Sequence, residues 1–188
     1  MTLASFLRRG VELLASDYIR ELVNNVDLIA TPNEPCVRFY REMGLKDVLF
    51  LPFACNPTLH YVPLRGVCNR VDVVTFIGAM YRRKLKLLME LIRHRLPVLI
   101  FSSDRVYSRL FKRYFRGRGI WGRRYALIHA ASKLSLNIHV ESDLNWKANM
   151  RVFEVLASGG VLLTDNKRVV SRFFRLGRTL FLGKTRKI

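Results

Sequence analysis

The stretch from Asn149 to Asp165 most constrains the fold, because it contains a helix, a stop signal and a strand in immediate succession. Apolar residues at 152, 153, 155 and 156 predict a short helix, and Gly159-Gly160 is typical of the left-handed cap that ends one. The apolar run at 161–164 then predicts a buried strand. A helix that leads directly into a buried strand is one step of an α/β sheet.

The same alternation runs through the chain from residue 71 onward. We predict strands at 71–77, 97–101, 136–139, 161–164 and 179–182, and helices at 85–92, 106–115, 125–133, 150–156 and 169–174. Strands and helices alternating at these lengths favour a mostly parallel sheet with helices on both faces. The fold class is therefore α/β, with a Rossmann-like sheet.

The first sixty residues predict a smaller α/β piece. Leu3 to Val26 has helical spacing, 26–31 and 48–53 are apolar strands, and 36–43 is a helix that ends at Gly44. Prolines at 52, 57 and 63 favour an extended connector. We predict two parts: residues 1–63, a partial N-terminal domain with its connector, and residues 64–188, a complete Rossmann-like domain.

Charge divides the chain at a similar place. The formal net charge is +19, but residues 1–70 hold 8 Lys/Arg against 7 Asp/Glu, whereas residues 71–188 hold 25 against 7. Such a field favours anionic partners: diphosphates, nucleic acid or an acidic membrane surface. Arg outnumbers Lys 24 to 9 and Gln is absent, a composition that fits a thermophilic source.

Several classes of protein are disfavoured. No apolar run approaches the roughly 18 residues that span a bilayer. The arginines near the N-terminus are misplaced for a signal peptide, so we expect a cytoplasmic protein. The three cysteines are unevenly spaced, which favours free thiols, and the four histidines show no metal-binding pattern. Neither a Walker loop nor a Ser-His-Asp set is recognisable.

The loop Gly78 to Lys84 is a candidate anion site. It follows a predicted strand, its glycine permits close backbone approach, and three cations (Arg82, Arg83 and Lys84) begin the next helix. Cations at a helix N-terminus oppose the helix dipole, and a bound anion relieves that conflict. The alternative is an ordinary strand-to-helix turn with a solvated basic face.

Two features near residue 150 also have two interpretations. Arg151 and Glu154 share one face of a short helix, so they form either a solvated salt bridge or part of a site. His139 ends a strand at the ligand-binding edge of the sheet, where a histidine either contacts a ligand or satisfies a local backbone carbonyl.

One motif of the chain resembles a known family. It is the run Arg-x-Phe-Glu-x-Leu-Ala-x-Gly-Gly at 151–160, which is preceded by Leu136-Asn137-Ile138-His139 and followed by an apolar strand ending in Thr-Asp. It is similar to the nucleotide-sugar-binding end of GT-B glycosyltransferases, above all the group of CgeB-like and glycosyl transferase family 1 domains. The resemblance covers roughly residues 40–182. It implies transfer of a sugar from a nucleotide-diphospho-sugar to an acceptor hydroxyl, without a tightly bound metal.

The resemblance also implies roles for particular residues. Glu154 matches the glutamate that accepts hydrogen bonds from the ribose of the nucleotide, and a carboxylate suits a pair of hydroxyl donors. The position eight residues earlier, often a second glutamate in retaining families, is Trp146 here. The donor-binding set expected from loop, strand end and helix is Gly78, Arg82, Lys84, Asn137, His139, Asn149, Arg151 and Glu154.

A complete GT-B N-terminal domain is longer than residues 1–63. We therefore expect most of it to be absent, and a second chain to be a possible source of the acceptor domain. Two other functions stay open at this point: a non-catalytic nucleotide-sugar-binding or scaffold domain, and a basic nucleic-acid-binding module.

A basic, aromatic stretch at 105–124 has three interpretations. It is a helix with core aromatics and solvated arginines, an amphipathic face that docks on anionic lipid, or a surface that stacks bases and neutralises phosphates.

Overall fold

The structure is a computed structural model that describes residues 21, 24–62, 69–104, 109–139, 148–165, 168–174 and 180–183. Within these residues the chain forms two compact units, divided between Phe53 and Ala54. Most of the helical region predicted at Leu3–Val26 lies outside the described residues. The boundary predicted at 63/64 falls within the second unit, because the segment after Ala54 packs on that unit.

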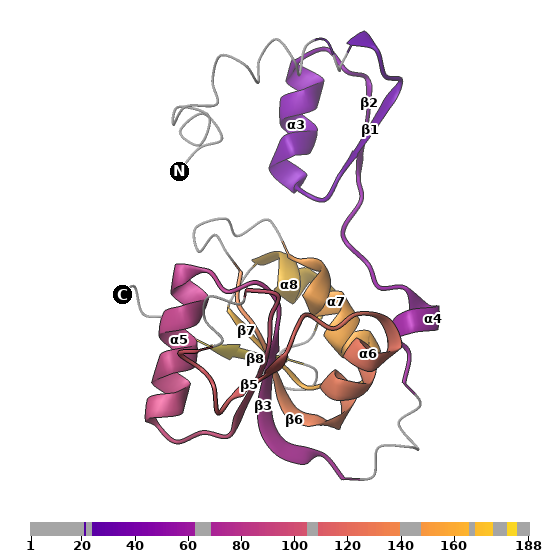
Figure 1. The fold of residues 1–188 in the computed structure, drawn as a ribbon. Coiled ribbons are helices and arrows are strands. Elements are labelled where there is room, and N and C mark those ends of the chain that lie inside the picture. The colour runs from indigo at the N-terminus through magenta and orange to yellow at the C-terminus, as the bar shows by residue number, and fades with distance from the viewer. Residues whose placement is uncertain are drawn as a thin grey trace. The chain divides into compact units, whose positions relative to one another are not determined.

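The first unit is a β-α-β element (Figure 1). Its strands β1 (Leu28–Thr31) and β2 (Asp47–Phe50) pair in parallel, and helix α3 (Glu34–Glu42) connects them. A small core around Leu45 and Val48 joins the helix to one face of the two strands. The strand and helix predictions for this region are confirmed to within a few residues.

The second unit contains one six-stranded parallel sheet. Its strands are β3 (Val71–Ile77), β4 (Val98–Phe101), β5 (Phe115–Gly117), β6 (Ser132–Asn137), β7 (Leu162–Asp165) and β8 (Leu180–Gly183). Its helices are α4 (Pro57–His60), α5 (Arg82–Arg93), α6 (Gly122–Ala131), α7 (Met150–Ala157) and α8 (Arg168–Phe173). Helix α5 covers one face, whereas α6 and α7 cover the other (Figure 1). The α/β fold class is confirmed.

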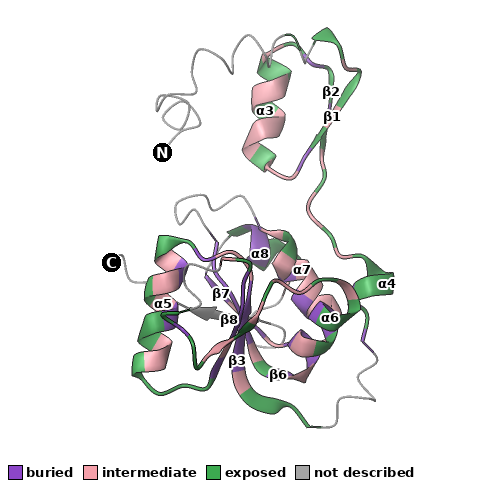
Figure 2. Ribbon diagram, viewed as in Figure 1, coloured by how far each residue is buried: buried purple, intermediate pink, exposed green. Residues whose placement is uncertain are grey.

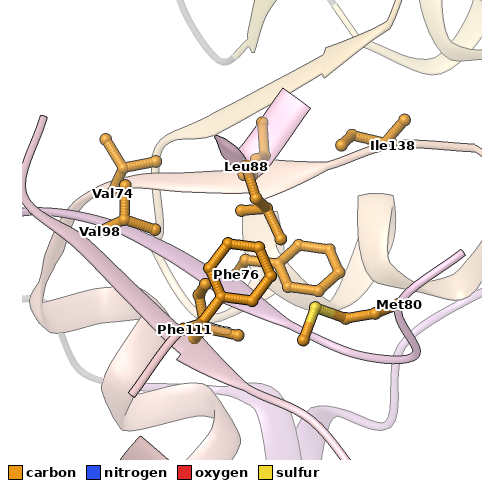
Figure 3. Close-up of a cluster of buried hydrophobic side chains, with 9 residues drawn as sticks. Val74, Phe76, Met80, Leu88, Val98, Phe111 and Ile138 are labelled. Atoms are coloured by element: carbon orange, nitrogen blue, oxygen red, sulfur yellow. The ribbon is translucent and has the colours of Figure 1, made fainter. Parts of the chain in front are cut away.

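The core of this unit lies where α5 packs against the central strands. Phe76, Leu88 and Ile100 are fully buried there, and Phe111 joins them from the segment before β5 (Figure 3). A second apolar cluster joins α7 to β7 and α8. Strand β3 is buried over its C-terminal half, because neighbouring strands and both helical layers enclose it (Figure 2).

Two predictions about local structure were wrong. The helix predicted at 106–115 is absent from its described part, because 109–114 form turns and Phe115 begins the edge strand β5. Pairing of Phe115 with Ile100 outweighs the helical spacing of the aromatics. The connector predicted to be extended contains α4, because Asn56 caps it by accepting a 3.0 Å hydrogen bond from the Thr58 N–H, and Pro57 suits a first turn.

Candidate donor-binding site

The order of the strands locates a binding crevice. The sheet runs β5-β4-β3-β6-β7-β8, which is the order 3-2-1-4-5-6 of doubly wound dinucleotide-binding domains. In such sheets ligands bind beyond the carboxyl ends of the strands where the order reverses, here between β3 and β6. Gly78 follows β3 and Asn137 ends β6, so both lie at this point.

The loop after β3 is fixed to the neighbouring strand β4. The Gly78 N–H donates to the Phe101 carbonyl at 2.9 Å, and the Met80 N–H donates to Asp104 Oδ2 at 2.6 Å. Gly78 has a φ of +147°, a conformation that favours glycine. Because Gly78 has no side chain, another group can approach the backbone of this loop closely.

The group that approaches Gly78 is the guanidinium of Arg151, from the first turn of α7. A Cβ built on Gly78 would lie 2.6 Å from Arg151 Nη2. Arg151 Nη1 also donates to Asn137 Oδ1 at 3.4 Å. Arg151 thus spans the gap between the ends of β3 and β6.

The side-chain amides of Asn137 and Asn149 also contribute to this arrangement. Asn149, the N-cap residue of α7, donates from Nδ2 to Asn137 Oδ1 at 2.9 Å. Asn137 in turn donates from Nδ2 to Thr164 Oγ1 at 3.1 Å. Asn137 is fully buried, so its hydrogen bonds lock the ends of β6, β7 and α7 together.

His139 also contacts the place where the ends of β6 and β7 meet the start of α7. Its Nε2 accepts a 3.2 Å hydrogen bond from the Asn149 N–H, so the proton is on Nδ1, which lies 2.5 Å from Asp165 Oδ1. Asp165 also accepts from the His139 N–H at 3.2 Å. Both ring nitrogens are used within the protein, so His139 orients the start of α7.

Lys84 is buried beneath the loop. Its ammonium donates to the Ala79 carbonyl at 3.3 Å and lies 4.9 Å from the Tyr81 ring centroid. Burial, followed by repulsion from Arg151, lowers the pKa of Lys84 to about 8. A lysine with this pKa gains charge stabilisation when an anion binds beside it.

The two arginines before Lys84 have different surroundings. Arg82 is exposed, and no contact joins it to the other predicted residues in the described part of the chain. Arg83 lies 3.9 Å from Asp165 Oδ2 and 3.5 Å from the His139 carbonyl. Arg83 therefore ties α5 to the junction that orients α7.

Glu154 lies one turn further along α7 and faces a second polar group. Its Oε1 is 3.8 Å from His60 Nε2. Among the ion pairs of the described residues none joins Glu154 to Arg151, so these two do not form a salt bridge. Burial raises the pKa of the Tyr125 hydroxyl, and so does Glu154, whereas Arg151 lowers it. Glu154, Arg151 and Tyr125 are thus close enough for electrostatic interaction.

The end of α7 is shaped by its two glycines. Gly159, with a φ of +73°, donates to the Leu156 carbonyl, and Gly160 donates to the Val155 carbonyl, which together form a Schellman cap. A Cβ on Gly160 would lie 3.0 Å from the His129 carbonyl oxygen. The predicted helix stop is confirmed, and the second glycine also allows α6 and α7 to pack closely.

Buried polar atoms without a hydrogen-bond partner gather around this site. Among the described residues, they include Arg151 Nε, Asn149 Oδ1 and His129 Nε2. His129 is fully buried and its Nδ1 lies 2.7 Å from Ser135 Oγ. Burial, with Arg151 and His60 nearby, lowers the pKa of His129 to about 3, so it is neutral. Unpaired buried polar atoms are rare in proteins, and their concentration here fits a ligand site.

Of the eight predicted site residues, six are linked at this edge by the contacts above: Gly78, Lys84, Asn137, His139, Asn149 and Arg151. Within the described residues Arg82 makes no such contact, and the ion pair of Glu154 is with His60. The sequence did not single out His60, Asp104, Tyr125, His129 or Asp165, and it placed Arg83 in the candidate anion loop but not in the donor-binding set. Asp104 and Asp165 each follow a predicted strand at the ligand edge, which is a usable signal. His60 and Tyr125 reach the site only through helix packing, which no sequence pattern reveals.

The aromatic residues in the described part of the basic stretch at 105–124 differ in exposure. Phe111 is buried in the core, as the core-helix interpretation predicts for the aromatics, whereas Trp121 is 76% exposed. In the segments that the structure covers, no three potential metal ligands gather, and no helix has the length and apolar character needed to cross a bilayer. A surface hollow of about 510 Å³ in the first unit is lined by two acidic and two basic residues with Val37 and Phe50, so its charges cancel.

The strand order defines a Rossmann-like domain. The model of a family described as glycosyl transferase-like matches residues 82–187, and the chain belongs to this family. No curated protein sequence matches the chain.

Solved structures show the same fold. HepE (Alr3699) from Anabaena, solved in complex with UDP-glucose, is 12% identical with a TM-score of 0.60, and the match covers 93% of this chain and 55% of HepE. AviGT4, a glycosyltransferase involved in avilamycin A biosynthesis, is 16% identical with a TM-score of 0.52, over 78% of this chain and 48% of AviGT4. The chain spans about half the length of these proteins.

Proposed function

We propose that the second unit binds a nucleotide-diphospho-sugar and that the chain takes part in transferring the sugar to an acceptor hydroxyl. The observation that carries this proposal is the Arg151 guanidinium above Gly78, at the point where the strand order reverses. Family membership supports the reaction class, and HepE, which has the same fold, was solved with UDP-glucose.

The diphosphate is assigned to the mouth of the crevice. Arg151 offers a planar fork of donors, which matches phosphate oxygens, and Lys84 adds a second positive charge beneath the loop. Arg82 is exposed at the start of α5, from where its long side chain can reach a bound phosphate. Positive charge at this place would stabilise the leaving diphosphate as the bond to the sugar breaks.

The ribose is assigned to Glu154. A carboxylate accepts hydrogen bonds from two adjacent hydroxyls, and Glu154 lies one helical turn beyond Arg151 on the same helix. The sugar is assigned to the side of Asn137 and Asn149, where Asn149 Oδ1 is buried without a partner among the described residues. His139 holds Asn149 in place for this contact.

Calorimetric titration with UDP, GDP and single-stranded DNA tests the proposal. We expect a nucleoside diphosphate to bind, and Arg151→Ala and Glu154→Ala to weaken binding by about tenfold or more each. Arg93→Ala and Glu90→Ala are matched controls, since these two residues form an exposed ion pair with each other on α5.

The three classes of function give different results. Salt-sensitive DNA binding that ignores Glu154→Ala, without nucleotide binding, would identify a nucleic-acid-binding module instead. Nucleotide binding without release of diphosphate from a nucleotide-sugar, in the presence of candidate acceptors, would indicate a scaffold domain. Release of the nucleoside diphosphate that requires an acceptor and disappears in Arg151→Ala would establish transfer.

A further inference from the structure

The carboxylate of Glu154 is surrounded by groups from two other helices. His60, from α4, places Nε2 3.8 Å from Glu154 Oε1. Tyr125, from α6, packs its ring against the His60 ring with centroids 5.9 Å apart and planes at 68°. Both His60 and Tyr125 are less than a tenth exposed. The carboxylate of Glu154 therefore lies beside residues from two other helices.

The tautomer of His60 follows from a hydrogen bond within its own helix. Its Nδ1 accepts a 3.1 Å hydrogen bond from the Asn56 N–H, at the N-cap of α4. A neutral imidazole whose Nδ1 accepts carries its proton on Nε2. The protonated nitrogen, Nε2, is therefore the one that lies 3.8 Å from Glu154 Oε1, and the cap of α4 determines this tautomer.

A donor on one side of a carboxylate affects what the other side can bind. The two oxygens of Glu154 can accept about four hydrogen bonds. His60 lies beside Oε1 and Tyr125 also interacts with this carboxylate, so two side chains from other helices restrict its rotation. The Glu154 side chain is 17% exposed, so it keeps an open side for a ligand.

We propose that His60 is a positioning residue that orients Glu154 toward the ribose hydroxyls of the bound nucleotide. This inference rests on the proposed function, because it needs Glu154 to contact the ribose. It assigns a role in the donor site to α4, which begins four residues after the boundary between the two units at Phe53/Ala54.

A double-mutant cycle tests the inference. The nucleoside diphosphate that binds the intact chain more tightly, UDP or GDP, is titrated into His60→Ala, Glu154→Ala and the double variant. We expect His60→Ala to weaken binding about fivefold to tenfold, and to have no further effect once Glu154 is replaced by alanine. Inorganic pyrophosphate has no ribose, so its binding should not change in His60→Ala.

Two more variants separate positioning from a structural role. His60→Gln keeps an N–H donor near the Nε2 position and should restore most of the affinity. His94→Ala replaces an exposed histidine at the end of α5 and should leave affinity unchanged. Thermal unfolding of each variant shows whether the chain is folded at the titration temperature.

The outcomes distinguish the inference from the proposed function. If Glu154→Ala weakens nucleotide binding but His60→Ala does not, or if the two effects simply add, His60 does not position Glu154 while the proposed function stands. Equal loss of pyrophosphate and nucleotide affinity in His60→Ala also overturns the inference. If neither nucleotide binds the intact chain, the proposed function and the inference fail together.

Discussion

Replacing Gly78 with alanine tests the arrangement of the whole crevice. Alanine disfavours the φ of +147° at this position, which costs about 1–2 kcal/mol of unfolding free energy. The new Cβ would also lie 2.6 Å from Arg151 Nη2, so the guanidinium must move. Because this atom is the far end of a flexible side chain, the displacement itself adds little to the loss of stability.

The loss should appear in binding. Moving the guanidinium removes its contact with the diphosphate, and a charge-assisted hydrogen bond contributes about 1.5–3 kcal/mol. We therefore expect the affinity for a nucleoside diphosphate to fall about tenfold to a hundredfold in Gly78→Ala. Calorimetric titration measures the affinity, and urea unfolding measures the stability of the same samples.

Gly117 provides the matched control. It has a φ of +133° at the end of β5, but no described atom lies within 4 Å of the position that a Cβ would take there. Gly117→Ala should therefore lose about as much stability, roughly 1–2 kcal/mol, and keep its affinity. If both variants lose affinity equally, or if Gly78→Ala weakens binding further in an Arg151→Ala background, the reasoning about the guanidinium is refuted.

Three other substitutions test separate parts of the structure. Lys84 binds its proton less tightly in the folded chain, with a pKa of about 8 against the ordinary 10.5, so stability should rise with pH through this window. In urea titrations, the unfolding free energy relative to Lys84→Met should increase by at most about 3 kcal/mol between pH 7 and pH 10.5. A difference that does not change with pH would contradict the burial of Lys84. Gly160→Ala would place a Cβ closer to two backbone oxygens than side-chain atoms normally lie, and calorimetry should show a loss of unfolding free energy of about 1–3 kcal/mol. An unchanged melting temperature would show that α6 and α7 can move apart there. Asp165→Asn should weaken the hold on His139, lowering unfolding free energy by about 1–3 kcal/mol and nucleotide affinity with it; a loss of stability alone would mean that α7 does not depend on this contact.

The order of elements and the location of the site edge followed from the sequence. Alternating strand and helix patterns depend on local burial, which repeats at fixed periods along the chain. Gly78 and Arg151 could be selected because each stands at a strand end or a helix start. The failures occurred where tertiary contacts outweigh local preference, as at Phe115, which pairs with β4 instead of continuing a helix.

The partners of the site residues could not be predicted. Arg151 and Glu154 stand one helical turn apart, and spacing alone made a salt bridge between them plausible. In the folded chain Arg151 turns to Gly78 and Asn137, whereas Glu154 turns to His60. Packing selects between these choices, because both side chains are half-buried and contact the partners that other segments bring beside them.

The sequence by itself determined that this protein has a parallel α/β sheet, with cations and a glycine loop at the edge where such sheets bind ligands. Only the tertiary structure decided that Arg151 covers Gly78, that His139 and Asp165 orient the start of α7, and that His60 reaches Glu154. The physical reason is range: periodicity and caps act over a few residues, whereas these contacts join segments as far apart as positions 60 and 154, which only packing of the finished sheet and its helices brings together.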